Sequence, residues 1–312
     1  MQVWPRKRAS RIYPRVHAWA TAQDCRLLGF AGYKVAMAHA YVIDTRKTSR
    51  TKGEEVAFPV TIIECPPLKL ISARFYKKTP YGKKIVAQIF GSKLEKEIAR
   101  KIPLPKKDPS FDKIQPGSFD EGRCIVATQP KMAGIGKKKP EIFEVAFGGK
   151  PEQQLEYIKQ HLGKDIPITD VFKEGQMVDI HSVTKGHGIQ GSVKRFGVAI
   201  RQHKAEKTKR GPGSLGAWKA QGHMMYRVAH AGQMGFHTRT EYNKVVIKID
   251  ADVKKINKDG GFKHYGVVKA PYILLKGSIG GASKRLIRFN HAIRNKSHIT
   301  PDTFQFQRVI VQ

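Results

Sequence analysis

The chain has 312 residues, enough for one large or two modest hydrophobic cores, and 40% of them are hydrophobic, as in globular proteins. Its 58 Lys and Arg residues stand against 25 Asp and Glu residues, a net charge of +33. A compact domain of this length has a radius of gyration of about 20 Å. So much charge in that volume opposes compaction, and it predicts a polyanionic partner.

Composition also excludes two classes of protein. The first residues are basic but no apolar region follows them, and no apolar run in the chain approaches ~20 residues. We therefore expect a protein that is neither secreted nor membrane-spanning. Three widely spaced cysteines, Cys25, Cys65 and Cys124, form no CxxC pair and no even disulfide framework. Reduced thiols in the cytoplasm fit them best.

Residues 1–26 are predicted to form a basic N-terminal arm. The arm interleaves cations with aromatic residues: Arg6, Lys7, Arg8, Arg11 and Arg15 with Trp4, Tyr13 and Trp19. The cations attract phosphates. The aromatic rings have two open interpretations, because they can stack on bases or anchor the arm to the core.

Strand-like sequence follows in two separated regions. Residues 27–80 contain AYVID, VAFPVTIIEC and LKLISARFY, and residues 165–312 contain MVDIHSVT, NKVVIKID, GVVKAPYILLKGSI and FQFQRVIVQ. These runs are rich in β-branched and aromatic residues and are bounded by turn residues. We expect the two regions to form one β-barrel domain.

Residues 81–164 are predicted to be a mixed, partly helical insertion. GSKLEKEIAR carries a capping box in Ser92 and Glu95, which predicts a helix. A second helix is predicted over 151–163, with Pro at its start and Gly at its end. EIFEVAF is expected to be a strand.

Residues 197–240 are predicted to be an extended finger loop within the barrel domain. From Lys194 to Arg239 there are ten Lys or Arg residues and one acid, Glu206, and seven glycines lie between Gly197 and Gly235. Such a segment cannot fold around itself, so its structure must come from what it touches. Its tryptophan, Trp218, is expected to stack in a partner or to pack at the base of the loop.

The KGHGIQG motif has two functional interpretations. Gly186, Gly188 and Gly191 match GxGxxG, but a dinucleotide site needs a following helix and an acid ~20 residues on. The next residues, SVKRFGVAI, disfavour a helix, so we expect no cofactor. The glycines can instead let a phosphate chain approach the backbone, or they can serve a tight turn, and both can hold at once.

No catalytic or metal-binding constellation is apparent. His223, His230 and His237 recur every seven residues, but no Cys or acidic co-ligand lies near them at metal spacing. RNA contact or plain packing is the expected role of these histidines. We therefore predict no enzyme activity and no bound metal.

At these residues the chain resembles the universal large-subunit ribosomal protein three family, in its archaeal and eukaryotic branch. The family signature is filled by Phe172, Asp179, Ser182, Thr184, Gly186, His187, Gly188, Gly191 and Arg195. The chain also matches the family at three further stretches: GAW at 216–218, HAGQMGFHTRTEYNK and YILLKGSIGGASKRLIR. We interpret the chain as an archaeal-type member.

The resemblance implies a fold that is mainly β with an α/β insertion: a translation-factor-like β-barrel with an N-terminal arm and a long basic, Gly-rich finger. It implies binding near the 3′ end of the large rRNA early in assembly, with the finger directed to the peptidyl-transferase region and Trp218 at its tip. Implied neighbours are the fourteenth universal large-subunit protein and a protein of the twenty-fourth eukaryotic type. The location would be the cytoplasm, within the large subunit.

The predicted function is a structural rRNA-binding protein that needs no cofactor. The residues expected to bind rRNA are Arg6, Lys7, Arg8, Arg11, Lys185, Gly186, His187, Gly188, Gly191, Lys194, Arg195, Arg201, His203, Lys204, Lys207, Lys209, Arg210, Trp218, Lys219, His223, Arg227, His230, His237, Arg239, Lys284 and Arg285. Two rivals remain at this point: an RNA-modifying enzyme with a cofactor at KGHGIQG, and a DNA-packaging protein, because charge alone does not separate RNA from DNA.

Overall fold

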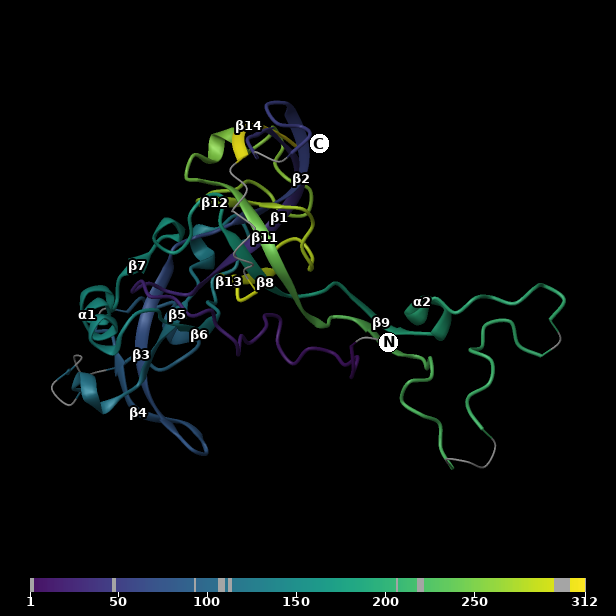
Figure 1. The fold of residues 1–312 in the computed structure, drawn as a ribbon, viewed down its shortest axis with the longest axis horizontal. Helices are drawn as coiled ribbons and strands as arrows, with labels where there is room; N and C mark the ends of the chain where they lie inside the picture. Colours follow the sequence, from purple (N-terminus) through teal and green to yellow (C-terminus); the bar gives the residue numbers. More distant parts are fainter. Residues whose placement is uncertain are drawn as a thin grey trace.

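The protein is built mainly from β-strands, in two sheets and one short two-stranded ribbon (Figure 1). The structure is a computed structural model that describes residues 3–46, 49–92, 94–105, 110–111, 114–205, 207–217, 222–294 and 304–311. The expectation of a mainly β protein is confirmed.

Seven strands form the larger sheet, in the order β13-β8-β11-β12-β2-β1-β14. Because β13 also pairs with β1, six of these strands close into a ring, and β14 pairs with the other half of β1. The strands are β1 (Gly29–Asp44), β2 (Glu55–Glu64), β8 (Met177–Val183), β11 (Thr238–Asp250), β12 (Tyr272–Lys276), β13 (Leu286–His291) and β14 (Phe304–Ile310). All except β13 lie where the sequence predicted strands.

The second sheet has the order β4-β3-β5-β6, with β7 paired to β3. Its strands are β3 (Leu68–Thr79), β4 (Gly82–Phe90), β5 (Glu121–Ala127), β6 (Ile142–Ala146) and β7 (Asp165–Ile166). The strand LKLISARFY, expected beside β1 and β2, pairs instead with β4, β5 and β7. Pro66 and Pro67 separate it from β2, and neither can donate to a ladder, so the chain leaves the ring there.

One of the two predicted helices is confirmed and one is wrong. α1 (Pro151–His161) begins at a proline, as expected. The described residues of GSKLEKEIAR form turns and a 3-10 helix, Ile98–Arg100. Ile98 is buried with Ile71 and Ala127 in a small satellite core, and this tertiary packing overrides the local helix propensity. The region 81–164 is accordingly more sheet than helix.

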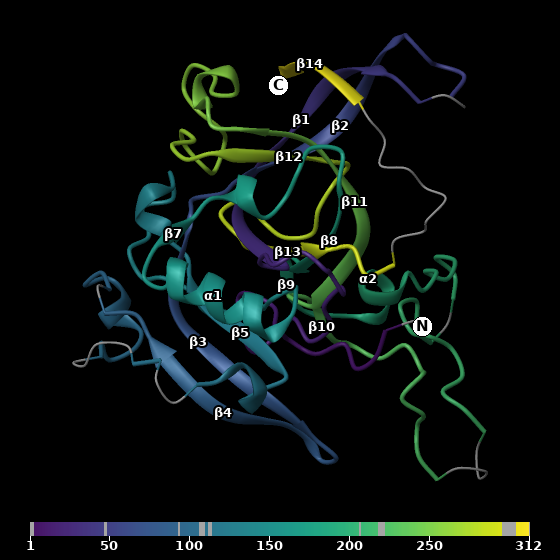
Figure 2. The ribbon, with the colours of Figure 1, turned by 60° about the vertical axis from the view of Figure 1, so that its left-hand side comes forward.

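One hydrophobic core runs through both sheets. Its largest fully buried side chains include Tyr33 and Phe30 of the ring and Phe75 of the second sheet. α1 lies against the second sheet (Figure 2). Its Gln154 side chain accepts a hydrogen bond from the backbone N–H of Gly122 in β5 (2.8 Å).

A buried carboxylate fastens two loops to the end of β2. Glu64 is fully buried and accepts hydrogen bonds from the backbone N–H groups of Gly134 (3.1 Å), Lys269 (2.6 Å) and Ala270 (2.8 Å). It also accepts one from the Tyr265 hydroxyl. The charge is tolerated there because several donors surround it.

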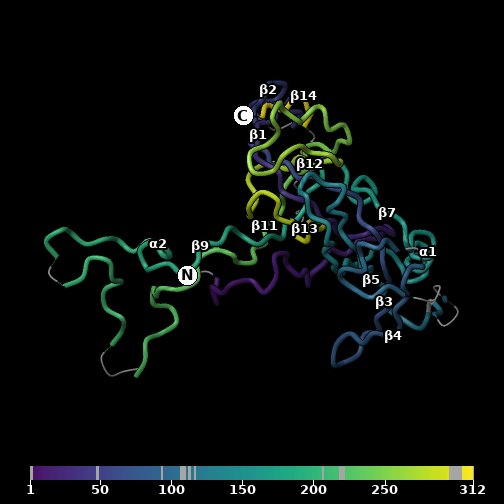
Figure 3. The backbone as a smooth tube through the Cα atoms, turned by 180° about the vertical axis from the view of Figure 1, so that it is seen from behind, coloured from purple at the N-terminus to yellow at the C-terminus, as the bar shows by residue number. Residues whose placement is uncertain are grey.

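Two segments lie outside these cores. The described residues of 185–236, here called the projection, leave the ring between β8 and β11 and extend away from it (Figures 1 and 3). The N-terminal arm begins beside the base of the projection and runs past the ring toward the second sheet. No helix in the described part of the chain is long and apolar enough to cross a membrane.

Candidate nucleic-acid interface

The base of the projection is a short antiparallel ribbon held by the arm. β9 (Gly186–Gln190) pairs with β10 (Gly232–Gly235). Ala9 donates its backbone N–H to the carbonyl oxygen of Phe236 (2.8 Å), and the His237 ring contacts the carbonyl oxygen of Lys7 through Nδ1 (2.9 Å). The arm therefore fixes where the projection leaves the ring.

Arg195 makes three side-chain hydrogen bonds at the base of the projection. It lies in α2 (Ser192–Phe196), and its guanidinium donates to the carbonyl oxygens of Gln233 (3.1 Å) and His230 (2.8 Å) and, more weakly, of Arg6 (3.4 Å). Gly232 permits this contact, because a Cβ there would come within 2.8 Å of an Arg195 nitrogen. One side chain thus joins the arm, α2 and the returning strand.

The aromatic residues of the arm anchor it within the protein. The Trp4 ring stacks on Phe196 at 6.2 Å and meets Tyr226 edge-on at 5.7 Å. Tyr13 is buried, and its hydroxyl donates to the carbonyl oxygen of Ile142 (3.1 Å), while Trp19 packs against the main core. Of the two interpretations left open by the sequence, these contacts support anchoring.

A second clamp holds the arm at its other end. Arg288 of β13 is 3% exposed, and it donates to the carbonyl oxygens of Pro14 (3.2 Å) and Glu144 (2.8 Å). Its guanidinium also lies 4.3 Å from the centre of the Phe143 ring. Burial lowers the pKa of this guanidinium to about 9. Arg288 therefore joins arm, ring and second sheet.

Cations crowd a hollow of about 400 Å³ between the arm and the ribbon. Arg6, Lys185, Arg195 and Arg239 line it, and no carboxylate is among the described residues of its lining. Partial burial, and then the charge of Arg6, lower the pKa of both Arg195 and Arg239. Such repulsion between like charges is relieved by an anion, so the hollow is suited to phosphate.

Most predicted contact residues of the projection and arm face solvent. The exposed ones are Lys7, Arg8, Arg11, Lys185, Gly186, His187, Gly188, Gly191, Lys194, Arg201, His203, Lys204, Lys207, Lys209, Arg210, His223, Arg227 and Lys284. Arg6, Arg195, His230, Arg239 and Arg285 are partly buried, and His237 is buried. Trp218, Lys219 and Glu206 lie outside the described residues.

The glycine motif forms part of the ribbon. Gly188 has a left-handed backbone (φ 68°), and a bulge interrupts the pairing near Gly235, where a Cβ would come within 2.0 Å of the Lys185 carbonyl oxygen. The expectation that no helix follows the motif is wrong, because α2 begins directly after Gly191. However, β9 pairs antiparallel to β10, and a dinucleotide site requires a parallel βαβ unit.

No metal site is evident within the described ranges, where no group of three or more His, Cys, Asp or Glu side chains gathers to hold an ion. Cys65 and Cys124 are buried free thiols and Cys25 is a partly exposed one. Burial raises the pKa of all three, so they are poor nucleophiles.

Sequence reasoning missed several residues of this surface. Lys34 of β1 lies at the base of the projection, where its ammonium donates to the carbonyl oxygens of Ile279 and Gly281. Burial, and next the charge of Lys185, lower its pKa. Arg74 and Arg123 of the second sheet, away from the projection, were also missed, although each lies between two buried residues of its strand and so belongs to the outward face.

These features define a class: a mainly β protein whose cationic arm and projection lie outside its cores. The family model of ribosomal protein L3 matches residues 1–303 of the chain. The chain is also 46% identical over 296 residues to large ribosomal subunit protein uL3 of Archaeoglobus fulgidus, which covers 93% of this chain and 89% of the relative. It is 46% identical over 304 residues to the uL3 protein of Methanosphaera stadtmanae (94% and 90%) and 44% identical over 307 residues to that of Pyrobaculum aerophilum (94% and 90%).

The chain belongs to the ribosomal protein L3 family. Members of this family are structural constituents of the large ribosomal subunit and not enzymes. The resemblance noted in the sequence is thereby confirmed, and the rival interpretation as an RNA-modifying enzyme is discarded.

Proposed function

We propose that the chain is a structural constituent of the large ribosomal subunit in the cytoplasm, and that it binds rRNA through its arm and projection. One observation carries this proposal: in the described part of the chain, exposed Lys and Arg residues cover a projection without a core of its own, and its base encloses a hollow lined by four cations and no carboxylate. The like charges of such a surface repel one another, and a polyanion relieves that repulsion.

The binding mechanism follows from this arrangement. Exposed side chains such as Lys204, Lys207 and Lys209 neutralise phosphates and release counterions. Arg195 and the ribbon fix the direction in which the projection enters the RNA. The shape of the RNA, rather than base-edge readout, is then the main determinant of the site.

Finer assignments rest on the family resemblance. We propose that the closed ring is the translation-factor-like barrel, that the protein binds near the 3′ end of the large rRNA and nucleates assembly, and that the projection points to the peptidyl-transferase centre with Trp218 near its tip. Its proposed protein neighbours are the fourteenth universal protein and the twenty-fourth eukaryotic-type protein. The length of chain between the two ribbon strands supports such a reach (Figure 1).

A salt titration tests the proposal. The full-length protein is titrated with large-subunit rRNA, and the logarithm of the association constant is expected to fall linearly with the logarithm of salt concentration. Replacing Lys204, Lys207 and Lys209 by Gln is expected to reduce that slope by about 2–3, close to one per lost phosphate contact. An association constant that does not respond to salt would contradict the proposal.

The matched control replaces three exposed lysines outside the projection, Lys173, Lys254 and Lys263, by Gln. The control has the same net charge as the test variant, so a slope that falls equally in both would assign binding to total charge and not to the projection. Co-sedimentation of the intact protein with large subunits rather than with the nucleoid separates the RNA-binding function from DNA packaging.

A further inference from the structure

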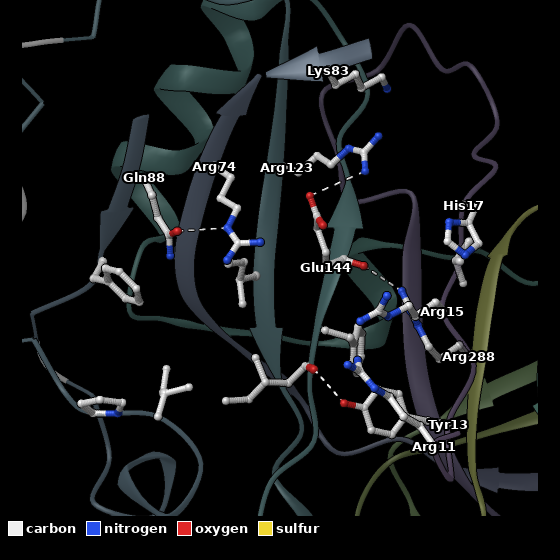
Figure 4. A pocket seen from close by; sticks show the side chains of 17 residues that line it. Arg11, Tyr13, Arg15, His17, Arg74, Lys83, Gln88, Arg123, Glu144 and Arg288 are labelled. Atoms are coloured by element: carbon white, nitrogen blue, oxygen red, sulfur yellow. Dashed lines mark hydrogen bonds and ion pairs between the residues drawn. The ribbon is translucent and has the colours of Figure 1, made fainter. Parts of the chain in front are cut away.

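A large cleft lies between the arm and the second sheet, away from the projection. Its volume is about 850 Å³, within the range of small-molecule sites. One wall is the outer face of β3, β4, β5 and β6, and the other is the arm around Arg11, Arg15 and His17 (Figure 4).

Side chains alternate between the two faces of each strand, and this alternation determines which residues of the sheet face the cleft. In β5, Cys124 and Val126 point into the core, so Arg123 and Ile125 face the cleft. Gln88 stands opposite Arg74 in the register, and Arg74 stands opposite Arg123. A polar row therefore crosses the strands, and an apolar patch that includes Phe90 and Ile142 lies next to it.

The polar row is held rigidly. Arg74 Nε donates to Gln88 Oε1 (3.0 Å), and Gln88 Nε2 donates to Ser72 Oγ (3.1 Å). Arg123 contacts Glu121 (2.7 Å) and Glu144 (3.6 Å). Glu144 also accepts a hydrogen bond from the Tyr76 hydroxyl (2.7 Å), so this carboxylate already has partners within the protein.

The arm wall carries charge without partners. Within the described part of the chain, Arg11, Arg15 and His17 make no hydrogen bond or ion pair, and Arg11 and Arg15 are exposed. Six Lys or Arg side chains and one carboxylate are among the described residues that line the cleft, and Glu121, outside the lining, pairs with Lys83 and Arg123. An occupant must therefore be anionic at the arm and must offer a flat apolar body with hydrogen-bonding edges to the sheet.

We propose that this cleft binds a single unstacked nucleotide. The base lies on the apolar patch of Phe90, Ile102 and Ile142, its edge meets the fixed Arg74–Gln88 pair, and its phosphate meets Arg11 and Arg15. Flat aromatic bases, planar hydrogen-bonding edges and a phosphate occur together in this one ligand class. The nucleotide comes from an RNA strand or from solution; only the RNA source rests on the proposed function.

The first experiment titrates the full-length protein with AMP, GMP, CMP and UMP by calorimetry, and with adenosine, ribose 5-phosphate and inorganic phosphate as partial ligands. At least one mononucleotide is expected to bind at least about tenfold more tightly than any partial ligand. Equal binding of inorganic phosphate would overturn the proposal, as would no binding, or tighter binding of an oligoglutamate peptide.

Variants locate the site. The double substitution Arg11→Ala and Arg15→Ala is expected to weaken mononucleotide binding at least about tenfold, because it removes charge-assisted contacts. The matched control is Lys7→Ala with Arg8→Ala, two exposed cations of the same arm that do not line the cleft. Equal losses in both double variants would overturn the assignment.

Phe90→Leu tests the stacking contact. It keeps an apolar side chain and removes the ring face, and a loss of about fivefold or more is expected. Unchanged affinity would overturn the placement of the base. A thermal melt of each variant shows whether the fold is retained. Gln88→Leu, on the outer face of the sheet, tests the contact with the base edge, and it is also expected to weaken mononucleotide binding.

A cross-linking pair distinguishes the two sources. Large-subunit rRNA carrying 4-thiouridine is irradiated in complex with the protein, and in parallel 8-azidoadenosine monophosphate is irradiated with the same complex. A cross-link from rRNA to residues 88–90 or 102 assigns the ligand to RNA, and a cross-link from the free nucleotide there assigns it to solution. Loss of salt-dependent rRNA binding with retained mononucleotide binding would reject the proposed function alone, and the reverse result would reject only the cleft.

Discussion

The closed ring and the projection differ in how they accommodate charged side chains. The ring surrounds buried carboxylates with hydrogen-bond donors, as Glu64 and Asp179 show. The projection instead exposes many like charges, and its described turns are held mainly at the base. The ring, which shares its core with the second sheet, is therefore expected to be stable without a partner, whereas the projection needs its partner for a defined shape.

The largest expected effect lies in the ring. Glu64→Ala would leave three backbone N–H groups and the Tyr265 hydroxyl without their acceptor, and we expect the free energy of unfolding to fall by about 3–5 kcal/mol. Chemical denaturation measures it. Glu97→Ala, at a surface ion pair with Lys131, is the control and should change little; equal losses would show that Glu64 has no special role.

The next effect depends on pH. Desolvation, followed by the charge of Arg288, lowers the pKa of His181 to about 4, and desolvation, followed by Arg26, does the same for His291. Both folded-state values lie below the unfolded value of about 6.5. The unfolded chain thus binds more protons between about pH 6.5 and 4, so stability falls as the pH falls through that window, by about 2–3 kcal/mol for each histidine.

Denaturation midpoints of the wild-type protein and of His181→Gln between pH 4 and 7 test this dependence. The variant is expected to lose less stability on acidification. His203→Gln, an exposed residue of the projection, is the control. Parallel pH profiles for all three proteins would rule out the proposed contribution of His181.

A smaller and local effect is expected at the junction of the two regions. Arg195→Ala removes hydrogen bonds to three backbone carbonyls and should destabilise the β9–β10 ribbon by about 1–2 kcal/mol, with little change in global unfolding. Faster hydrogen exchange at the amides of 186–190 and 232–235 reports it. The control is Lys194→Ala, at the neighbouring exposed residue, which should leave hydrogen exchange unchanged. Similar exchange rates in the two variants would show that Arg195 does not hold the ribbon.

The smallest effect on folding is expected in the projection itself. The triple Lys204, Lys207 and Lys209→Gln variant should alter the free energy of unfolding by less than about 0.5 kcal/mol while it weakens rRNA binding. Thermal melts in the absence of RNA measure the first quantity. A large loss of stability would mean that these side chains support the fold, and the contrast between the two regions would fail.

The two regions also differ in how far sequence alone predicts them. Six of the seven ring-sheet strands were predicted, because apolar and β-branched runs bounded by turns have few alternatives. β13 was missed because Arg288, Asn290 and His291 read as a polar surface, yet all three are buried. Arg288 is satisfied by carbonyl groups of Pro14 and Glu144, which no local pattern reveals.

Composition predicted the exposure of the projection but not its internal contacts. Arg195 and His237 belong to the same basic tract as Lys204 and Lys207, and nothing in their neighbours separates them. Their carbonyl partners lie 35 to 230 residues away, from His230 to Lys7. The cleft of the second sheet was not predicted for the same reason, since it requires the arm to lie over strands whose order is a tertiary property.

The pairing of β1 with β13 has a consequence for synthesis. Gly29 pairs with Asn290 and Tyr33 with Leu286. The ring therefore cannot close on β1 until the ribosome has synthesised the chain as far as β13. Contacts so distant in sequence form slowly, because the intervening chain must be ordered first. The basic arm is made earliest and reaches its own partners, such as Phe236, equally late. During translation the nascent chain therefore presents a strand edge and a cationic tail together, and the time it spends in that state is set by the speed of elongation.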